Sequence, residues 1–286
     1  MDLSIIIPSF NTKHLTTRCL RSIIETLKHS KITYEIIVID NASRDGSVEV
    51  LNKDFREVLK ILNKENVGYG SANNQGLKIA KGTYCLMLNS DIDALNGSLE
   101  NLLAFAKEHP KSFVGGKLYN EDGSLQPSCG PGFTPWYVFL MLFCQADKLH
   151  ITRYSPDHVM RVMWVSGACL LGTKKSFYDV GLFDEGIFMY MDEIELLERA
   201  RKKGYTVWFT PEARFIHTGA ASSGNKRSPV KNIFRGLMYF YRKHYPHYVN
   251  LLRAMLTVKG RIAILIGKYF DKQDLVDIYE EGLGLV

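Results

Sequence analysis

Residues 84–93 read Tyr84-Cys85-Leu86-Met87-Leu88-Asn89-Ser90-Asp91-Ile92-Asp93. The first five side chains have the composition of a buried β-strand, and the polar run after them marks its end. Two carboxylates separated by one residue then follow. Such a pair can converge on one divalent cation, because Mg²⁺ and Mn²⁺ prefer oxygen ligands. A DxD tripeptide alone is a weak signal, so its meaning depends on the fold around this strand.

Apolar strand segments alternate with helical patterns on both sides of this stretch. Strands are expected at residues 3–8, 34–40, 59–62, 84–89 and 112–116, and helices at 16–29, 47–53, 71–81 and 98–107. This alternation predicts an α/β fold with a doubly wound, mostly parallel sheet and helices on both faces. Ligands bind such sheets outside the carboxyl ends of the strands. Pro8, Ser9, Asn11, Asp40 and Asp91 are therefore expected on one edge of the sheet.

The second half of the chain carries two more groups of candidate residues. Residues 117–163 are less regular, a strand is expected at 164–171, and the helix expected at 192–203 follows a stretch rich in glycine and aromatic residues. Its first turn holds Asp192, Glu193 and Glu195, which the helix dipole alone would favour. A positioned carboxylate can also act as a general base. His217 ends the last of two short strands expected at 206–209 and 214–217; it is either structural or a nitrogen ligand suited to Mn²⁺.

The composition fits a globular cytoplasmic protein. The chain has 286 residues, of which 46% are hydrophobic and 23% charged, enough for one large α/β domain with an appendage. Its five cysteines are scattered and form no CxxC pair, so neither a disulfide framework nor a zinc site is expected. No basic segment precedes the N-terminal apolar run, which stops at Pro8, so we expect no signal peptide. The longest apolar block, residues 136–144, is far shorter than the roughly 20 residues that span a membrane.

Charge is concentrated near the C-terminus. Residues 226–272 carry a net charge of +10, and the remaining residues carry −4. The basic residues of this stretch include Lys226, Arg227, Lys231, Arg235, Arg242, Lys243, Arg253, Lys259, Arg261 and Lys268. They alternate with the apolar residues Phe234, Leu237, Met238, Tyr241, Leu252, Met255 and Ile262. This mixture suits either a helix lying at the surface of an anionic membrane or a helical pair packed on the catalytic domain.

Taken together, these patterns resemble glycosyltransferase family 2, whose members have the GT-A fold. The resemblance covers about residues 3–245 and is closest to bacterial rhamnosyltransferase-like members. The matching segments are residues 4–11, 38–43, 66–76, 88–93, 164–168, 181–199 and 211–217. Each motif is weak alone, but together they occur in the order that the family requires. The resemblance implies a GT-A catalytic domain over residues 1–225, with a nucleotide-binding half to about 116 and an acceptor-binding half after it. Residues 226–286 would then be a basic helical extension.

The resemblance also implies an activity: inverting transfer of one sugar from a dTDP- or UDP-linked donor to a glycan or lipid-linked glycan, with Mn²⁺ or Mg²⁺ as cofactor. Such an enzyme would act in cell-surface polysaccharide or glycolipid synthesis, at the inner face of a membrane. The residues matched to the nucleotide-sugar are Pro8, Ser9, Asn11, Asp40, Asn74, Gly76 and Asp91, with Asp40 at the nucleobase. The residues matched to the metal are Asp91, Asp93 and His217. Glu193 matches the general base and Asp192 its neighbour.

The sequence departs from the family pattern at the catalytic acids. The pair reads Asp192-Glu193, the reverse of the common order, and Glu195 stands where aspartate is frequent. Either member of the pair could therefore be the base, and a catalytically inactive family member is an alternative. The Gln-x-x-Arg-Trp signature of processive relatives is absent, which favours the addition of a single sugar.

Two unrelated functions fit the sequence less well. Residues 68–73 approach the G-x-G-x-x-G fingerprint of dinucleotide-binding enzymes, but Asn73 replaces the third glycine and the segment follows the third expected strand. The basic, tyrosine-rich end suggests nucleic-acid binding, yet no recognised nucleic-acid module is present, so no nucleic-acid partner is expected. The sequence does not indicate an oligomeric state.

Overall fold

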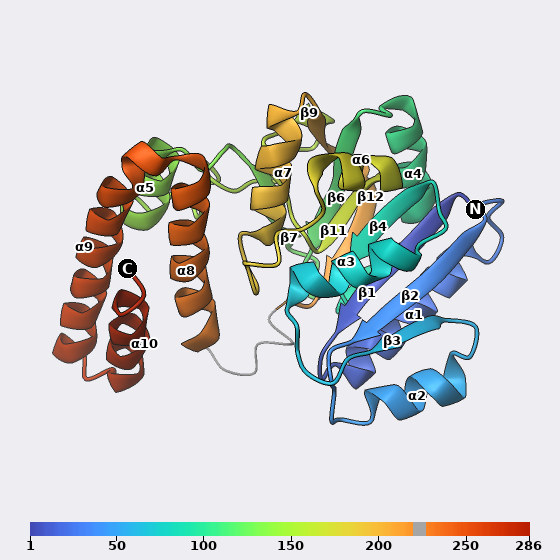
Figure 1. Cartoon of the computed structure of the whole chain (residues 1–286), viewed down its shortest axis with the longest axis horizontal. Helices are drawn as coiled ribbons and strands as arrows, with labels where there is room; N and C mark the ends of the chain where they lie inside the picture. Colours follow the sequence, from blue (N-terminus) through green and yellow to red (C-terminus); the bar gives the residue numbers. More distant parts are fainter. Residues whose placement is uncertain (220–226) are drawn as a thin grey trace.

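The computed structural model of the chain describes residues 1–219 and 227–286, without the side chains of residues 227–229. A central sheet has the strand order β3-β2-β1-β4-β11-β6-β12-β5 (Figure 1). Its strands are β1 (Leu3–Ser9), β2 (Tyr34–Asp40), β3 (Leu59–Leu62), β4 (Tyr84–Leu88), β5 (Ile92–Ala94), β6 (Ser112–Tyr119), β11 (Cys169–Thr173) and β12 (Thr206–His217). Short strands at its margins are β7 (Leu125–Gln126) and β9 (Met160–Arg161), and β8 (Cys129–Gly130) pairs with β10 (Trp164–Val165).

The sheet is mixed and mostly parallel. Strands β3, β2, β1 and β4 run parallel to one another, as do β6 and β12, whereas β11 and β5 run antiparallel to their neighbours. Helices that connect or cover the strands are α1 (Lys13–Leu27), α2 (Ser47–Asp54), α3 (Tyr69–Ile79), α4 (Ser98–Glu108), α6 (Lys174–Val180) and α7 (Asp192–Lys202). The expected α/β class with helices on both faces is confirmed.

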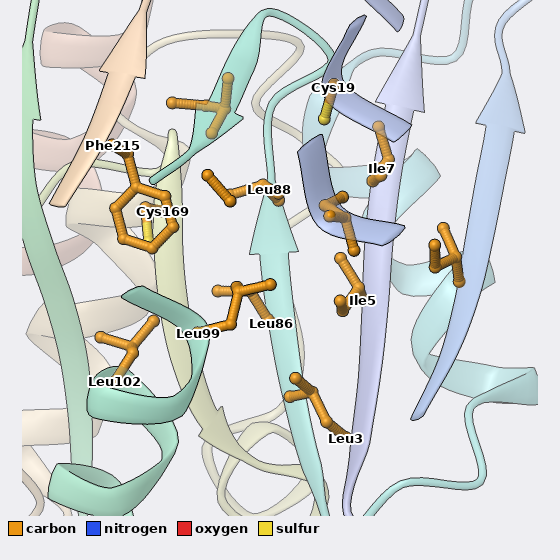
Figure 2. Close-up of a cluster of buried hydrophobic side chains, with 14 of the residues drawn as sticks. Leu3, Ile5, Ile7, Cys19, Leu86, Leu88, Leu99, Leu102, Cys169 and Phe215 are labelled. Carbon is orange, nitrogen blue, oxygen red and sulfur yellow. The ribbon is translucent and has the colours of Figure 1, made fainter. Parts of the chain in front are cut away.

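Alternating side chains of β1 divide the core into two layers, as the twofold period of a strand requires. Leu3, Ile5 and Ile7 pack with residues of α1 and α4, and Figure 2 shows them beside Leu86 and Leu88 of β4. Ile6 points to the opposite face, where α3, α6 and α7 pack. Both layers are apolar, so the polar carboxyl ends of the strands emerge from a rigid support.

Three segments differ from the sequence expectation. The strand expected at 164–171 is interrupted, because residues 166–168 leave the sheet between β10 and β11. The two strands expected at 206–209 and 214–217 are one strand, β12, whose register shifts between Thr210 and Arg214. Pro211 lies in this irregularity and has no N–H to donate to a neighbouring strand. Within the less regular region, residues Pro135–Phe143 form helix α5.

The C-terminal region folds as helices that pack together with α5. These are α8 (Arg227–His244), α9 (Val249–Tyr269) and α10 (Gln273–Leu283), with a 3₁₀ turn, η1 (Pro246–Tyr248), between the first two (Figure 1). The apolar residues buried in this bundle include six that could have faced a membrane: Phe234, Leu237, Met238, Tyr241, Leu252 and Met255. Only Ile262 of the set named from the sequence is exposed. The domain boundary expected at residues 225 and 226, and Lys226 itself, lie outside the described residues. In the described part of the chain, no helix is both long and apolar enough to cross a membrane.

Candidate active site

A pocket of about 470 Å³ opens at the carboxyl ends of the central strands. The predicted site residues that line it come from distant parts of the sequence: Pro8, Ser9, Asp91, Asp192, Glu193 and His217. They are brought together because β1, β4 and β12 end near the start of α7. The prediction that strand ends collect polar side chains at one edge therefore holds for these residues.

Asp91 and His217 form the polar floor of this pocket. The Nε2 atom of His217 lies 3.3 Å from Oδ1 of Asp91 and 3.3 Å from Nδ2 of Asn89. The other ring nitrogen, Nδ1, lies 2.6 Å from Oε1 of Gln126 and donates its hydrogen to that carbonyl oxygen. Nε2 then accepts a hydrogen bond from the Asn89 amide, beside the Asp91 carboxylate; a cation bound there would take the place of that amide N–H.

The arrangement fits a divalent cation. Two ligands on adjacent corners of an octahedron, each about 2.1 Å from the metal, lie about 3.0 Å apart, close to the observed separation of Nε2 and Oδ1. A histidine that binds a metal commonly donates its second N–H to a fixed acceptor, which is the role of Gln126 here. Among the described residues, no group of three or more His, Cys, Asp or Glu side chains is placed to hold a metal. Asp91 and His217 would thus supply two ligands, leaving the remainder to a substrate diphosphate and water.

Asp93 does not join this pair, contrary to the sequence expectation. It lies on β5, does not line the pocket, and forms an ion pair with Arg18, whose Nε is 2.8 Å from Oδ2 of Asp93. Arg18 also donates to Glu121 and Thr218. The chain turns between β4 and β5, so the second carboxylate of the DxD tripeptide forms an ion pair that connects β5 to α1.

Asp192 and Glu193 begin helix α7 and both line the pocket. The chain reaches them through Tyr190 and Met191, which both have positive φ (64° and 68°). Such backbone strain in non-glycine residues is concentrated at functional sites. Asp192 is buried, and one of its carboxylate oxygens has no hydrogen-bond partner within the described residues. Burial, and then the charge of Glu193, raise the pKa of Asp192 well above its ordinary value.

Glu195 has a different role from its two neighbours. Its fully buried carboxylate accepts two hydrogen bonds of 2.9 Å from Nε of Arg199 and one of 2.7 Å from Nη2. Arg199 also donates to the carbonyl oxygens of Val180 and Leu182, which fixes the start of the 181–191 loop. From α8, Lys243 and His244 approach Glu195 within 2.8 and 3.0 Å.

These contacts control the ionisation of Glu195. Burial alone would raise its pKa, but hydrogen bonds from His244, Arg199 and Lys243 outweigh burial and lower the pKa to about 2. The Glu195 carboxylate therefore stays ionised and bonded to the scaffold, and it holds the helix that presents Asp192 and Glu193.

Two residues expected at the nucleotide lie beside the pocket instead of lining it. Asn11 is exposed, and its side-chain oxygen accepts a hydrogen bond from the backbone of Arg44. Asp40 is buried; one of its oxygens accepts from the backbone of Ser43, and no hydrogen-bond partner for the other is found among the described residues. The adjacent Asn41 lines the pocket. Asn11 thus stabilises a neighbouring loop, and Asp40 has one carboxylate oxygen without a partner among the described residues.

Asn74 and Gly76, expected to line the donor site, have packing roles in α3. The Asn74 amide donates to the carbonyl oxygen of Phe183 and accepts from its N–H, at 2.9 Å in each case. A Cβ on Gly76 would lie 2.4 Å from Ile6, so only glycine allows α3 to pack this closely on β1. Both side-chain positions face the protein interior, which the helical pattern of this segment did not reveal.

The glycines of the dinucleotide-like segment also have a local explanation. Gly68 has φ of 85°, and a Cβ there would lie 2.5 Å from the carbonyl oxygen of Phe188. The N–H of Tyr69 donates to that same oxygen at 3.0 Å. A Cβ on Gly70 would lie 3.1 Å from Phe183. Both glycines thus let the 181–191 loop approach the start of α3, which accounts for the fingerprint-like spacing without a dinucleotide.

Several pocket residues were not identified from the sequence. Arg153 contributes a cationic side chain from the irregular 117–163 region, with its guanidinium 5.7 Å from the ring centre of Trp164. The hydroxyl of Tyr69 donates to the carbonyl oxygen of Gly167 at 2.6 Å, which ties α3 to the turn between β10 and β11. Burial and the neighbouring Asp192 raise the pKa of Tyr69 well above 10. No periodic pattern marks Arg153, so only the tertiary structure reveals it.

Comparisons with known proteins agree with this fold. Residues 4–133 match the profile of the family described as glycosyl transferase family 2. The chain is 28% identical over 225 residues to the N-acetylglucosaminyl-diphospho-decaprenol L-rhamnosyltransferase of Mycobacterium tuberculosis, an alignment that covers 69% of this chain and 70% of that protein. It is 35% identical over 127 residues to the poly(ribitol-phosphate) beta-glucosyltransferase of Bacillus spizizenii, covering 43% of this chain and 20% of that protein.

A solved structure shares the fold. The chain superposes on GalNAc-T7, crystallised with UDP, GalNAc and Mn²⁺, with a TM-score of 0.61 and 19% sequence identity. The match covers 84% of this chain and 50% of that protein. At this level of identity the likeness concerns the fold alone.

Proposed function

We propose that this chain, whose residues 4–133 match glycosyltransferase family 2, transfers a single hexosyl unit, with inversion, from a nucleotide-diphosphate sugar to an acceptor hydroxyl. The observation that carries this proposal is the shared pocket of Asp91, His217 and Glu193. One side of that pocket offers ligands for a diphosphate-bound cation, and another offers a carboxylate. A transferase that proceeds by single displacement needs both functions around one reacting carbon.

The donor is proposed to lie across the ends of β1 and β4. Pro8, Ser9 and Asn41 line that side of the pocket. Asp40, which the family resemblance matches to the nucleobase, is buried beside Asn41. Asp91 and His217 would hold Mn²⁺ or Mg²⁺ at the diphosphate. When bound, such a cation stabilises the negative charge of a departing nucleoside diphosphate. The M. tuberculosis relative is a rhamnosyltransferase, which favours a dTDP- or UDP-linked hexose or deoxyhexose.

Glu193 is proposed as the general base. Its carboxylate takes the proton of the acceptor hydroxyl, and the hydroxyl oxygen bonds to the anomeric carbon on the face opposite the diphosphate. The bond from that carbon to the diphosphate oxygen breaks, the leaving group keeps the electron pair, and the configuration inverts. Asp192 is less suited to this role, because its carboxylate is buried, and burial and the charge of Glu193 raise its pKa well above the ordinary value. The Asp192 carboxyl would support Glu193 instead.

An anionic membrane surface is the second proposed partner, reached through α9. The inner face of this helix is apolar and packs in the bundle through Leu252, Met255 and Leu256. Its outer face is also apolar: the exposed residues Leu251, Val258, Ile262, Leu265 and Tyr269 recur at helical spacing. Leu265 is 67% exposed and Tyr269 84% exposed, values that argue for a covering partner.

The charges of α9 indicate which partner would cover this face. The helix carries Arg253, Lys259, Arg261 and Lys268 and no acidic residue. An apolar stripe on a helix whose own charges are all cationic fits the interface of an anionic bilayer, where each basic residue contributes about 1 kcal/mol. The name of the M. tuberculosis relative includes a lipid-linked sugar, and attachment at the inner face of a membrane would bring this enzyme to an acceptor of that kind.

The proposal is tested by thermal-shift measurements with UDP- and dTDP-sugars, each with and without Mn²⁺. A ligand present at 100 times its dissociation constant stabilises the folded state by about 2.7 kcal/mol. We expect a raised melting temperature for one nucleotide class, dependent on Mn²⁺, followed by turnover of that donor. Stabilisation without turnover of any donor would instead support an inactive, binding-only member of the family.

A further inference from the structure

A second pocket, of about 240 Å³, adjoins the donor pocket at Glu193. Arg153, Tyr190 and Glu193 line both pockets, so they form the wall that the two share. We propose that this second pocket binds the sugar ring of the acceptor that carries the attacked hydroxyl. The inference rests on the proposed function and adds a location, a ligand class and a role for the C-terminal helices.

The position of the second pocket relative to Glu193 suits an acceptor. A general base must lie within hydrogen-bond reach of the hydroxyl that it deprotonates. The donor pocket holds the proposed cation ligands on one side of Glu193, so the acceptor must approach from another side. The second pocket is bordered by the same carboxylate and contains neither Asp91 nor His217. A ring seated there would present its hydroxyl at the boundary with the donor.

The residues that line the second pocket suit a sugar ring. Phe133, Val138 and Met141 supply apolar surface, and Tyr137 and Trp164 supply aromatic rings. Asp147, Thr152 and Arg153 add polar groups to the same lining. A sugar offers an apolar C–H face to the rings and hydroxyls to these polar groups, whereas an alkyl chain offers only an apolar surface.

The C-terminal helices form part of this second pocket. Ile233 and Leu237 of α8 line the pocket opposite residues of α5. Helix α8 is attached to helix α7 by the contacts of Lys243 and His244 with Glu195. The C-terminal region therefore builds part of the acceptor site, and its side chains would select the acceptor sugar.

Saturation-transfer NMR with a panel of methyl hexosides and methyl N-acetylhexosaminides tests this assignment without knowledge of the natural acceptor. Met141→Trp fills the pocket from a partly buried position, and Phe139→Trp places the same ring on an exposed position of α5 outside the pocket. 1-Octanol serves as the alkyl-chain probe, and binding of UDP and dTDP with Mn²⁺ reports separately on the donor site.

We expect at least one glycoside to bind the wild-type protein. Met141→Trp should weaken that binding at least tenfold, whereas Phe139→Trp should leave it unchanged, and nucleotide binding should stay unchanged in both variants. Glycoside binding that is insensitive to Met141→Trp would overturn the assignment. So would a pocket that binds octanol and no glycoside. If the wild-type protein bound neither UDP nor dTDP, that result would instead count against the proposed function itself.

Discussion

His217 Nε2 lies 3.3 Å from the Oδ1 atom of Asp91, with its Nδ1–H bonded to Gln126. This pair, and not the two aspartates of the DxD tripeptide, offers adjacent ligands inside the pocket. The arrangement separates two residues that the sequence treats alike, Asp91 and Asp93, and leads to opposite expectations for their substitution.

Asp91→Asn should abolish the Mn²⁺ dependence of nucleotide binding, whereas Asp93→Asn should leave it nearly unchanged. The reason is that Asp93 pairs with Arg18 and does not line the pocket. Calorimetric titration of UDP and dTDP, with Mn²⁺ and with EDTA, measures the difference. Equal losses in the two variants would show that Asp93 also binds the metal.

Glu193→Gln should lower kcat by roughly 10² or more, the usual scale for a lost general base, with donor affinity little changed. The amide keeps the size of the side chain and cannot accept the proton. Steady-state kinetics with the donor identified by thermal shift provide the measurement. A large loss in Asp192→Asn with near-normal turnover in Glu193→Gln would reverse the roles of the two residues.

Asp192→Asn should not lower thermal stability at neutral pH. The folded-state pKa of Asp192 is raised, so the stability linked to its proton is fully present below the unfolded pKa of about 3.9 and is lost as pH rises through the folded value. The neutral amide avoids that loss. Melting temperatures of variant and wild type should therefore diverge in favour of the variant as pH increases. A variant less stable at every pH would argue against a protonated Asp192.

Glu195→Gln should destabilise the protein by about 3–5 kcal/mol, the cost of breaking a buried ion pair. The pKa of Glu195 is about 2, below its ordinary 4.5, so its contribution is complete above about pH 4.5 and disappears as pH falls toward 2. Urea unfolding at pH 7 and in mild acid checks both statements. Lys175→Met, which removes an exposed pair with Asp179, is the control and should cost less than about 1 kcal/mol. An equal effect of the two substitutions would contradict the role assigned to Glu195.

Leu265→Asp and Val258→Asp should each reduce flotation with vesicles that contain phosphatidylglycerol. Both residues lie on the exposed apolar stripe of α9, and a carboxylate there opposes insertion and anionic lipid alike. Leu125→Asp, at an exposed apolar residue of β7, should float like the wild type. Added salt should weaken binding, because exposed charges are screened. Equal binding to phosphatidylcholine vesicles, or no binding to either kind, would leave the stripe without a lipid role.

The sequence predicted the positions that strand ends determine and missed those that depend on side-chain direction. Asp91 and His217 line the pocket, and each follows or ends a strand that the sequence pattern indicates. Asp93, two residues later, does not line the pocket, because the chain turns between β4 and β5. Asn74 and Gly76 lie on the inward side of α3, which a motif match cannot show. Arg153 and α5 fall in a region without clear periodicity, so the second pocket could not be predicted.

The most direct test of the central claim is the anomeric configuration of the product. Once a donor and an acceptor glycoside are found, ¹H NMR of the wild-type reaction should show inversion at the transferred carbon. The same reaction with Glu193→Gln should be slower by roughly 10² or more and should also invert. Retention of configuration, or undiminished turnover by Glu193→Gln, would contradict a single displacement with Glu193 as its base.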